Sequence, residues 1–231
     1  MIELKNVSFQ YPGENSPALC DISVAFPEGK CTVVTGPNGS GKSTLFRILL
    51  GLDFPTKGQY LLDGEEITRK KLSQKAFASA FHAKIGFVFQ NSEVQLFTSS
   101  VEEEIAFGLR ELGLPENEVR GKTDRFLRQF GLESIRSRAP WGISGGEKKR
   151  TALAAVFAMD PQILVIDEPV SGLDEEAQAW VTSFLQDRRR EGRTLIIGTH
   201  SASLAHALAD GEIHLDKEHR VERQTVISAG K

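Results

Sequence analysis

Cysteine is scarce in this sequence, with only Cys20 and Cys31 among 231 residues. Each lies in an apolar, strand-like stretch, which is typical of reduced thiols in the core of a cytosolic protein. A metal-binding or redox pair would be more closely spaced and carried by a loop. The sequence therefore predicts two unpaired core thiols and no cysteine-based site.

Long apolar runs are also missing, and no stretch approaches the roughly 20 residues that cross a membrane as a helix. The opening residues MIELK lack the basic region and apolar core of a signal peptide. The net charge is only −3, which argues against a dedicated nucleic-acid binder. No internal repeat, low-complexity segment or long linker is present. We therefore expect a globular protein of one large or two small domains that is not integral to a bilayer.

A glycine-rich loop is the strongest motif in the chain and fits the pattern G-x-x-x-x-G-K-[ST]. It consists of Gly36, Pro37, Asn38, Gly39, Ser40, Gly41, Lys42, Ser43 and Thr44. An apolar strand, Cys31–Thr35, precedes it and a helical stretch at 45–50 follows, which is the context this motif requires. Backbone N–H groups of such a loop surround an anion, and the helix N-terminus adds positive potential. A chance match has a probability on the order of one per cent, so we predict nucleoside triphosphate binding. Lys42 should reach the β- and γ-phosphates, and the Ser43 hydroxyl should bind Mg²⁺.

Strands and helices alternate along most of the chain, which predicts an α/β fold with a mostly parallel sheet and helices on both faces. An antiparallel β part belongs to the first third. The middle third, about residues 91–159, is expected to be a helical subdomain within a single domain whose α/β core is formed by residues 1–90 and 160–231. The predicted strands are Ile2–Phe9, 18–26, Cys31–Thr35, 59–62, 85–89, 163–166, 195–198 and short ones within 212–227. The predicted helices are 45–50, 68–82, 101–112, 116–130, 147–159 and 175–191.

Several polar residues follow predicted core strands directly. Asp167 and Glu168 end one buried strand, His200 ends another, and Gln90 ends a third. Ligands bind at the carboxyl ends of strands in such sheets, so Asp167 is a candidate Mg²⁺ ligand and Glu168 can polarise an attacking water. Alone, the carboxylates could form a solvated acidic turn and His200 could be structural. Their common position beside the glycine loop favours a site, to which Gln90 could add its amide oxygen.

Ser144, Gly145, Gly146 and Glu147 precede a predicted helix and have the spacing of a capping box. Helix initiation alone would explain them. Alternatively, the two glycines expose backbone N–H groups to a phosphate. Because the chain already has one phosphate loop, a second anion site suggests an ATP reached from another subunit. A loop tyrosine, Tyr11, could stack on adenine.

The ordered motifs resemble those of the ATP-binding cassette (ABC) ATPases across essentially the whole chain. In that comparison Tyr11 is similar to the A-loop aromatic, 36–44 to Walker A, Gln90 to the Q-loop, 144–147 to the signature, 163–168 to Walker B, 171–174 to the D-loop and His200 to the switch histidine. The signature departs mildly from the family pattern, with Glu147 where Gln is more frequent and Ile143 where Leu is more frequent.

The resemblance implies a mechanism in which two ATPase domains pair head to tail and each ATP lies between one Walker A loop and the partner's signature. Glu168 would be the general base, His200 would contact the γ-phosphate, and Gln90 would link the metal site to a partner protein. Asp174 would cross the dimer interface. The chain has one copy of each motif and would need a second copy or a paralogue.

A narrower resemblance connects 89–97 and 101–109 with the ATPases of energy-coupling-factor (ECF) importers of vitamins, cobalt or nickel. Ser92 and Val94 depart from that pattern, where Pro and an acidic residue are common. The resemblance implies a peripheral subunit on the cytoplasmic face of the membrane, bound to an integral scaffold protein and a substrate-binding membrane subunit. Leu96 and Phe97 could line a groove for a partner helix, or simply pack within the helical subdomain.

Two other functions remain as alternatives. One is a soluble ABC ATPase that acts on DNA, ribosomes or cluster assembly; the chain lacks the coiled-coil insertion or the second cassette of the first two types. The other is a non-hydrolysing regulatory cassette, which is disfavoured because Lys42, Ser43, Asp167, Glu168 and His200 are all present.

Overall fold

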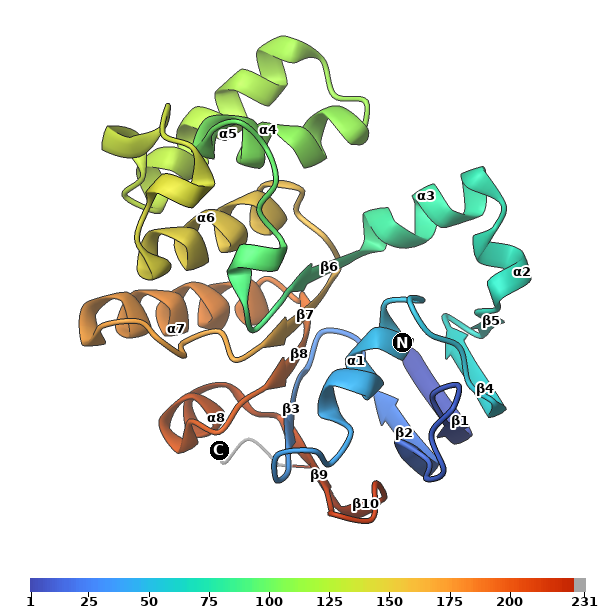
Figure 1. The fold of residues 1–231 in the computed structure, drawn as a ribbon. Coiled ribbons are helices and arrows are strands. Elements are labelled where there is room, and N and C mark those ends of the chain that lie inside the picture. Colours follow the sequence, from blue (N-terminus) through green and yellow to red (C-terminus); the bar gives the residue numbers. More distant parts are fainter. Residues whose placement is uncertain (227–231) are drawn as a thin grey trace.

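The computed structural model describes residues 1–226 and is built on two sheets and the helices around them (Figure 1). The larger sheet has six strands in the order β10-β9-β3-β8-β7-β6. Neighbouring strands are parallel except for β10, which is antiparallel to β9. The strands are β3 (Cys31–Thr35), β6 (Ile85–Val88), β7 (Ile163–Asp167), β8 (Thr194–Gly198), β9 (Gly211–Leu215) and β10 (Val221–Val226). Both faces of β7 and β8 are buried, as expected for parallel strands covered on both sides.

The smaller sheet has four antiparallel strands in the order β2-β1-β4-β5. They are β1 (Ile2–Phe9), β2 (Leu19–Phe26), β4 (Lys57–Leu62) and β5 (Glu65–Glu66). Apolar residues of β1 such as Ile2 and Leu4 are buried, whereas the intervening Glu3 is only partly buried. The sheet therefore turns one apolar face towards the rest of the protein.

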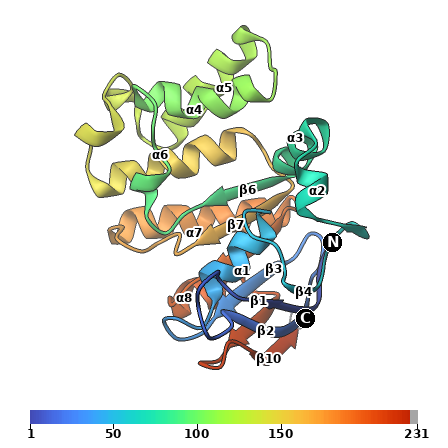
Figure 2. The same ribbon diagram turned by 45° about the vertical axis from the view of Figure 1, so that its right-hand side comes forward.

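Helix α1 (Lys42–Leu49) lies between the two sheets (Figure 2). Its side chains Leu45, Phe46 and Ile48 belong to one core cluster with residues of both sheets. This packing fixes the N-terminus of α1, where the glycine-rich loop ends.

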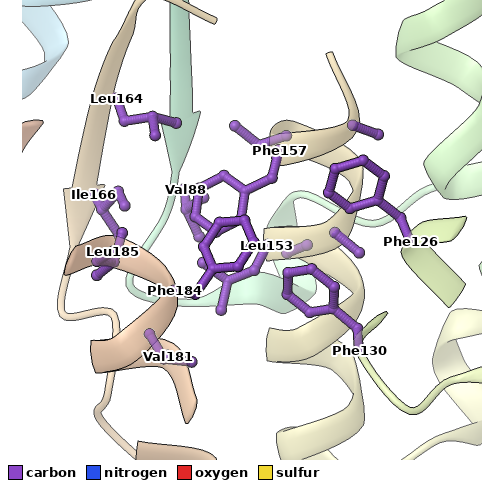
Figure 3. Close-up of a cluster of buried hydrophobic side chains, with 14 of the residues drawn as sticks. Val88, Phe126, Phe130, Leu153, Phe157, Leu164, Ile166, Val181, Phe184 and Leu185 are labelled. Carbon is purple, nitrogen blue, oxygen red and sulfur yellow. The ribbon is translucent and has the colours of Figure 1, made fainter. Parts of the chain in front are cut away.

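A second core cluster joins the larger sheet to helices on its other face. Phe126, Phe130, Phe157 and Phe184 pack here with Val88 and Ile166 (Figure 3), and the rings of Phe157 and Phe184 stack with centroids 4.6 Å apart. The helices of the chain beyond α1 are α2 (Arg69–Leu72), α3 (Lys75–Lys84), α4 (Val101–Glu111), α5 (Glu116–Gln129), α6 (Gly145–Ala158), α7 (Glu175–Arg190) and α8 (Ala202–Leu208). Short 3₁₀ turns are η1 (Ser92–Val94), η2 (Glu133–Ile135) and η3 (Pro140–Gly142).

The α/β fold class is confirmed, and the differences from the sequence prediction are local. The single helix expected at 68–82 is two helices, because the chain breaks at Ser73 and Gln74 between α2 and α3. Cys31 is fully buried, but Cys20 is only half-buried, so the expectation of two core thiols is wrong for Cys20. The last predicted strand residue, Ile227, lies outside the described residues. No helix within residues 1–226 combines the length and apolar character needed to cross a membrane.

Candidate functional site

A cavity of about 630 Å³ opens beside the glycine-rich loop. Eleven of the predicted site residues line it, and they come from the loop, from the ends of β6, β7 and β8 in the larger sheet, and, for Tyr11, from the segment after β1: Tyr11, Asn38, Gly39, Gly41, Lys42, Ser43, Thr44, Gln90, Asp167, Glu168 and His200. Gly36 and Pro37 instead line a neighbouring cavity behind the loop, and Ser40 is buried. The fold thus brings residues from distant parts of the sequence to one edge of the larger sheet.

The loop backbone needs its glycines. Gly36 has φ 144° and Gly41 has φ 100°, and both values lie where side chains are rarely tolerated. A Cβ atom would collide with the Leu215 carbonyl at the first position and with the Ala18 carbonyl at the second. The ammonium of Lys42 donates to the Gly36 carbonyl at 2.6 Å and to the Pro37 carbonyl at 3.1 Å. Burial lowers the pKa of Lys42, against the opposing effect of Asp167 and Glu168.

The Glu168 carboxylate is held by the end of the neighbouring strand. Its Oε1 accepts from the backbone N–H of His200 at 2.9 Å, and its Oε2 accepts from the Thr199 hydroxyl at 3.2 Å. Glu168 itself has φ 49°, and its N–H donates to the Gly198 carbonyl at 2.8 Å. Asp167 and Glu168 are each only 8% exposed. Thr199 was missed by the sequence interpretation, although it precedes His200 at the end of the same strand.

Asp167 lies among charges of both signs. Burial raises the pKa of its carboxyl and Glu168 adds to that effect, whereas Lys149, Lys42 and His200 lower it. Among residues 1–226, no three His, Cys, Asp or Glu side chains form a metal-binding group. The oxygen donors that line the cavity include the Ser43 hydroxyl, the Gln90 amide and the Asp167 carboxylate. One carboxylate, a few neutral oxygens and substrate phosphates are a donor set that suits Mg²⁺.

Tyr11 marks another part of the cavity. Its ring packs edge-to-face on Phe9 with centroids 4.8 Å apart, and its hydroxyl lies 3.1 Å from the Thr44 Oγ1. His219 also lines the cavity, and its carbonyl accepts from the Cys20 N–H at 2.9 Å. Sequence reasoning missed His219, because nothing in its neighbourhood shows that this hairpin folds back onto β2.

The segment 144–147 begins α6 and forms a complete capping box. Ser144 Oγ accepts from the Glu147 N–H at 3.3 Å, and Glu147 Oε2 accepts from the Ser144 N–H at 2.7 Å. The Ser144 N–H and the Ser144 hydroxyl both donate to the Glu147 carboxylate, and these two hydrogen bonds lower the pKa of Glu147. None of the four residues lines the cavity that contains Lys42. Glu147 therefore caps α6 as the Gln that is more frequent at this position would. The segment 144–147 does not contribute to the cavity around Lys42 in its own chain.

Comparison with known proteins gives a clear result. Residues 19–171 match the ABC transporter family. This chain belongs to that family. It is 43% identical to the nickel import ATP-binding protein NikO of Rhodobacter capsulatus, over 93% of this chain and 85% of the relative. It is also 41% identical to the energy-coupling factor transporter ATP-binding protein EcfA of Methanothermobacter thermautotrophicus, over 91% of this chain and 66% of the relative.

Solved ABC structures share the fold of this ABC protein. CbiO1 of Clostridium perfringens, part of the ABC transporter complex CbiONQ, aligns with a TM-score of 0.82 at 32% identity, covering 98% of this chain and 88% of CbiO1. The ATP-binding cassette MJ0796, solved as a dimer in a post-hydrolysis state with ADP and Pi, aligns with a TM-score of 0.88 at 27% identity over all of both chains. The P-loop ABC ATPase fold expected from the sequence is confirmed, and ATP is the nucleotide that this family binds.

Proposed function

We propose that this ABC protein is the ATP-hydrolysing subunit of an ECF-type importer for a metal ion or a vitamin, bound peripherally at the cytoplasmic face of the membrane. The observation that carries the proposal is the single cavity in which the glycine loop, Asp167, Glu168 and His200 meet. Import is supported by the relatives, of which one is named for nickel import and another for energy-coupling-factor transport.

ATP binding uses the loop at 36–44 and the adjacent aromatic. The phosphates lie along the loop N–H groups at the start of α1, where the backbone and the helix N-terminus favour anions. Lys42 exchanges its carbonyl partners for β- and γ-phosphate oxygens, which are better partners for a charged ammonium. The Tyr11 ring, which lines the same cavity, stacks on adenine.

Ser43, Asp167 and Gln90, which all line the cavity, would hold Mg²⁺. When bound, it neutralises charge on the phosphates that react. The buried position of Asp167, in a cavity that Lys42 also lines, supports its assignment as the metal carboxylate.

Glu168 acts as the general base for the attacking water. An ionised carboxylate only accepts hydrogen bonds, and each Glu168 oxygen already accepts one from the two residues that follow β8, Thr199 and His200. Remaining lone pairs can accept the proton of a water that lines up with the γ-phosphate. His200, whose Nε2 lies 3.9 Å from Glu168 Oε1, contacts the γ-phosphate from the same side.

A second cassette completes each site. Because the Ser144 to Glu147 segment does not line the cavity of its own chain, we assign it to the ATP of a partner cassette, either a second copy or a paralogue. Asp174, which caps α7 by accepting from the Ala177 N–H at 2.8 Å, lies in the segment assigned to the contact between the two cassettes.

A membrane partner docks on an exposed apolar patch formed by Val94, Phe97 and Phe107. Val94 is 69% exposed and Phe97 is 65% exposed, and the rings of Phe97 and Phe107 pack with centroids 5.0 Å apart. Leu96, in contrast, packs against the helical core. Phe97 and Phe107 are therefore exposed apolar side chains that contact each other, and Val94 lies three residues before Phe97 in the sequence; clustering of this kind supports an interaction surface.

The decisive experiment is a tagged purification from gently detergent-solubilised membranes of the native cell, with partners identified by mass spectrometry. We expect a multi-span scaffold protein and a small integral substrate-binding protein. Recovery of soluble partners only would contradict the importer function and leave the ATP site unaffected. A parallel assay of Mg²⁺-dependent ATP hydrolysis tests the enzymatic part separately.

A further inference from the structure

Lys149 is a buried cation on α6, five residues after the start of the capping box at Ser144. The residue is 4% exposed, and its Nζ donates to two backbone carbonyls, that of Phe89 at 3.1 Å and that of Gln90 at 3.3 Å. No carboxylate in the described part of the chain lies within ion-pair distance of this ammonium. A buried charge is costly unless it is hydrogen-bonded, and the carbonyls of Phe89 and Gln90 supply the hydrogen bonds of this ammonium.

The two carbonyls lie where the chain leaves the larger sheet. Strand β6 ends at Val88, and the backbone then runs through Phe89 and Gln90 towards η1. Gln95 holds the same segment from within the loop, because its Oε1 accepts from the Phe89 N–H and its Nε2 donates to the Phe87 carbonyl, both at 3.2 Å. Lys149 adds a connection from a different element, helix α6.

The side chain of Gln90 lines the nucleotide cavity, so the placement of its backbone determines where its amide reaches. The charges of Asp167 and Glu168, the two acids at the end of β7, also act on Lys149. Burial lowers the pKa of Lys149 to about 8, while Asp167 and Glu168 oppose that shift.

The neighbouring lysine makes a different contact. Lys148 pairs with the Glu93 carboxylate at 2.5 Å, and the Glu93 side chain is 62% exposed. An exposed pair of this kind contributes little to stability. Lys148 therefore binds the side chain of Glu93 and makes no hydrogen bond to the backbone of Gln90 in the described residues. Lys148 thus provides a matched control on the same helix.

We propose that Lys149 is a positioning residue for ATP hydrolysis, which ties the helix that begins with the signature segment to the backbone of Gln90. Any displacement of α6 is then transmitted to Gln90, and Gln90 is held in reach of the metal and water positions. The inference rests on the proposed function, because it assumes the role of Gln90 assigned there.

The test begins with Lys149→Met, which keeps the length of the side chain but removes the ammonium. We expect kcat for ATP hydrolysis to fall roughly tenfold, with the Kd for a fluorescent ATP analogue changed less than twofold. Lys149→Arg, which retains a cation and N–H donors, should recover most of kcat. Lys148→Met should leave kcat within twofold of the wild-type value. Equal losses in the two methionine variants would overturn the proposal.

A double-mutant cycle with Gln90→Ala shows whether Lys149 acts through Gln90. In the Gln90→Ala background, Lys149→Met should lower kcat by less than twofold, because residues that act as a unit are not additive. A repeated tenfold loss in that background would overturn the proposal. If Lys149→Met does not fold, Lys149→Gln takes its place in the same cycle. Wild-type protein without ATPase activity would reject the proposed function itself, whereas normal wild-type turnover with a silent Lys149→Met rejects only this inference.

Discussion

The carboxylate of Glu168 is bonded to the backbone of His200, whose N–H lies 2.9 Å from Glu168 Oε1. The two residues are 32 positions apart in sequence and end neighbouring parallel strands, β7 and β8. Because the bond uses the main chain of His200, the position of Glu168 depends on strand pairing and not on the histidine ring. The ring therefore remains free to contact a phosphate.

This geometry predicts the effect of Glu168→Gln. The amide can keep one accepted hydrogen bond but cannot take a proton, so ATP turnover should fall by roughly 10²- to 10⁴-fold. ATP binding should persist, because within residues 1–226 no hydrogen bond or ion pair joins the Glu168 side chain to the loop at 36–44. Turnover and nucleotide affinity are measured on the same preparation, and unchanged turnover would show that the base has been misassigned.

Tyr11 should contribute to affinity through its ring. Stacking of a base on an aromatic side chain is worth about 1–3 kcal/mol, so Tyr11→Ala should weaken ATP binding by roughly tenfold or more. Tyr11→Phe loses only the hydroxyl contact with Thr44 and should bind ATP within about threefold of wild type. Calorimetric titration compares the three proteins. If Tyr11→Phe and Tyr11→Ala bind ATP equally weakly, the ring does not stack on the base.

Two glycines predict opposite effects of alanine on stability. At Gly198 a Cβ atom would lie 2.6 Å from the Phe46 ring and 2.9 Å from Asp167 Oδ1, so Gly198→Ala should lower the free energy of unfolding by about 1–3 kcal/mol. At Gly121, within α5, nothing lies near the added Cβ, and Gly121→Ala should raise it by about 0.5–1 kcal/mol. Urea unfolding measures both. A tolerated Gly198→Ala would mean that β8 and α1 can separate more easily than their packing implies.

The apolar patch predicts a loss of membrane association. The double variant Val94→Ser with Phe97→Ser should remain folded and bind ATP, but less of it should co-sediment with native membranes. Leu52→Ser, at another exposed apolar residue that is 45% accessible, serves as the control and should co-sediment as wild type does. Equal recovery of all three proteins would exclude the patch as the docking surface.

The two cysteines should differ in reactivity. Burial raises the pKa of the Cys31 thiol to about 12, and the thiolate is the form that reacts. At pH 8 iodoacetamide should therefore modify half-buried Cys20 well before Cys31 in the native protein, and both should react after unfolding. Mass spectrometry of tryptic peptides follows each site. Equal labelling rates in the folded protein would contradict the burial of Cys31.

Much of the site could be predicted from the sequence, because most of its residues belong to short motifs or directly follow an apolar strand. The loop at 36–44 carries its own strand, glycines and helix, and Asp167 follows a wholly apolar strand. Thr199 also follows an apolar strand, but neither it nor His219 nor Lys149 belongs to a recognisable motif. Their involvement depends on contacts with residues more than 30 positions away in sequence: Glu168 for Thr199, Cys20 for His219 and Gln90 for Lys149.

Leu96 and Phe97 illustrate the same division on the surface. Both are apolar neighbours in a polar stretch, and the sequence alone predicts the same role for them. In the structure Leu96 packs against the helical core while Phe97 faces outward beside Phe107. Only the path of the chain between η1 and α4 decides which of the two can meet a partner.

The sequence by itself determined the chemistry of this protein, because glycines, a lysine and strand-terminal acids in that order suit phosphate and metal binding wherever they are brought together. The tertiary structure decided the geometry. Parallel pairing of β7 with β8 places the His200 backbone on Glu168, and packing of α6 against the end of β6 buries Lys149 on Gln90. These contacts join residues that are distant in sequence, and local sequence patterns contain no information about which distant backbone groups will be neighbours.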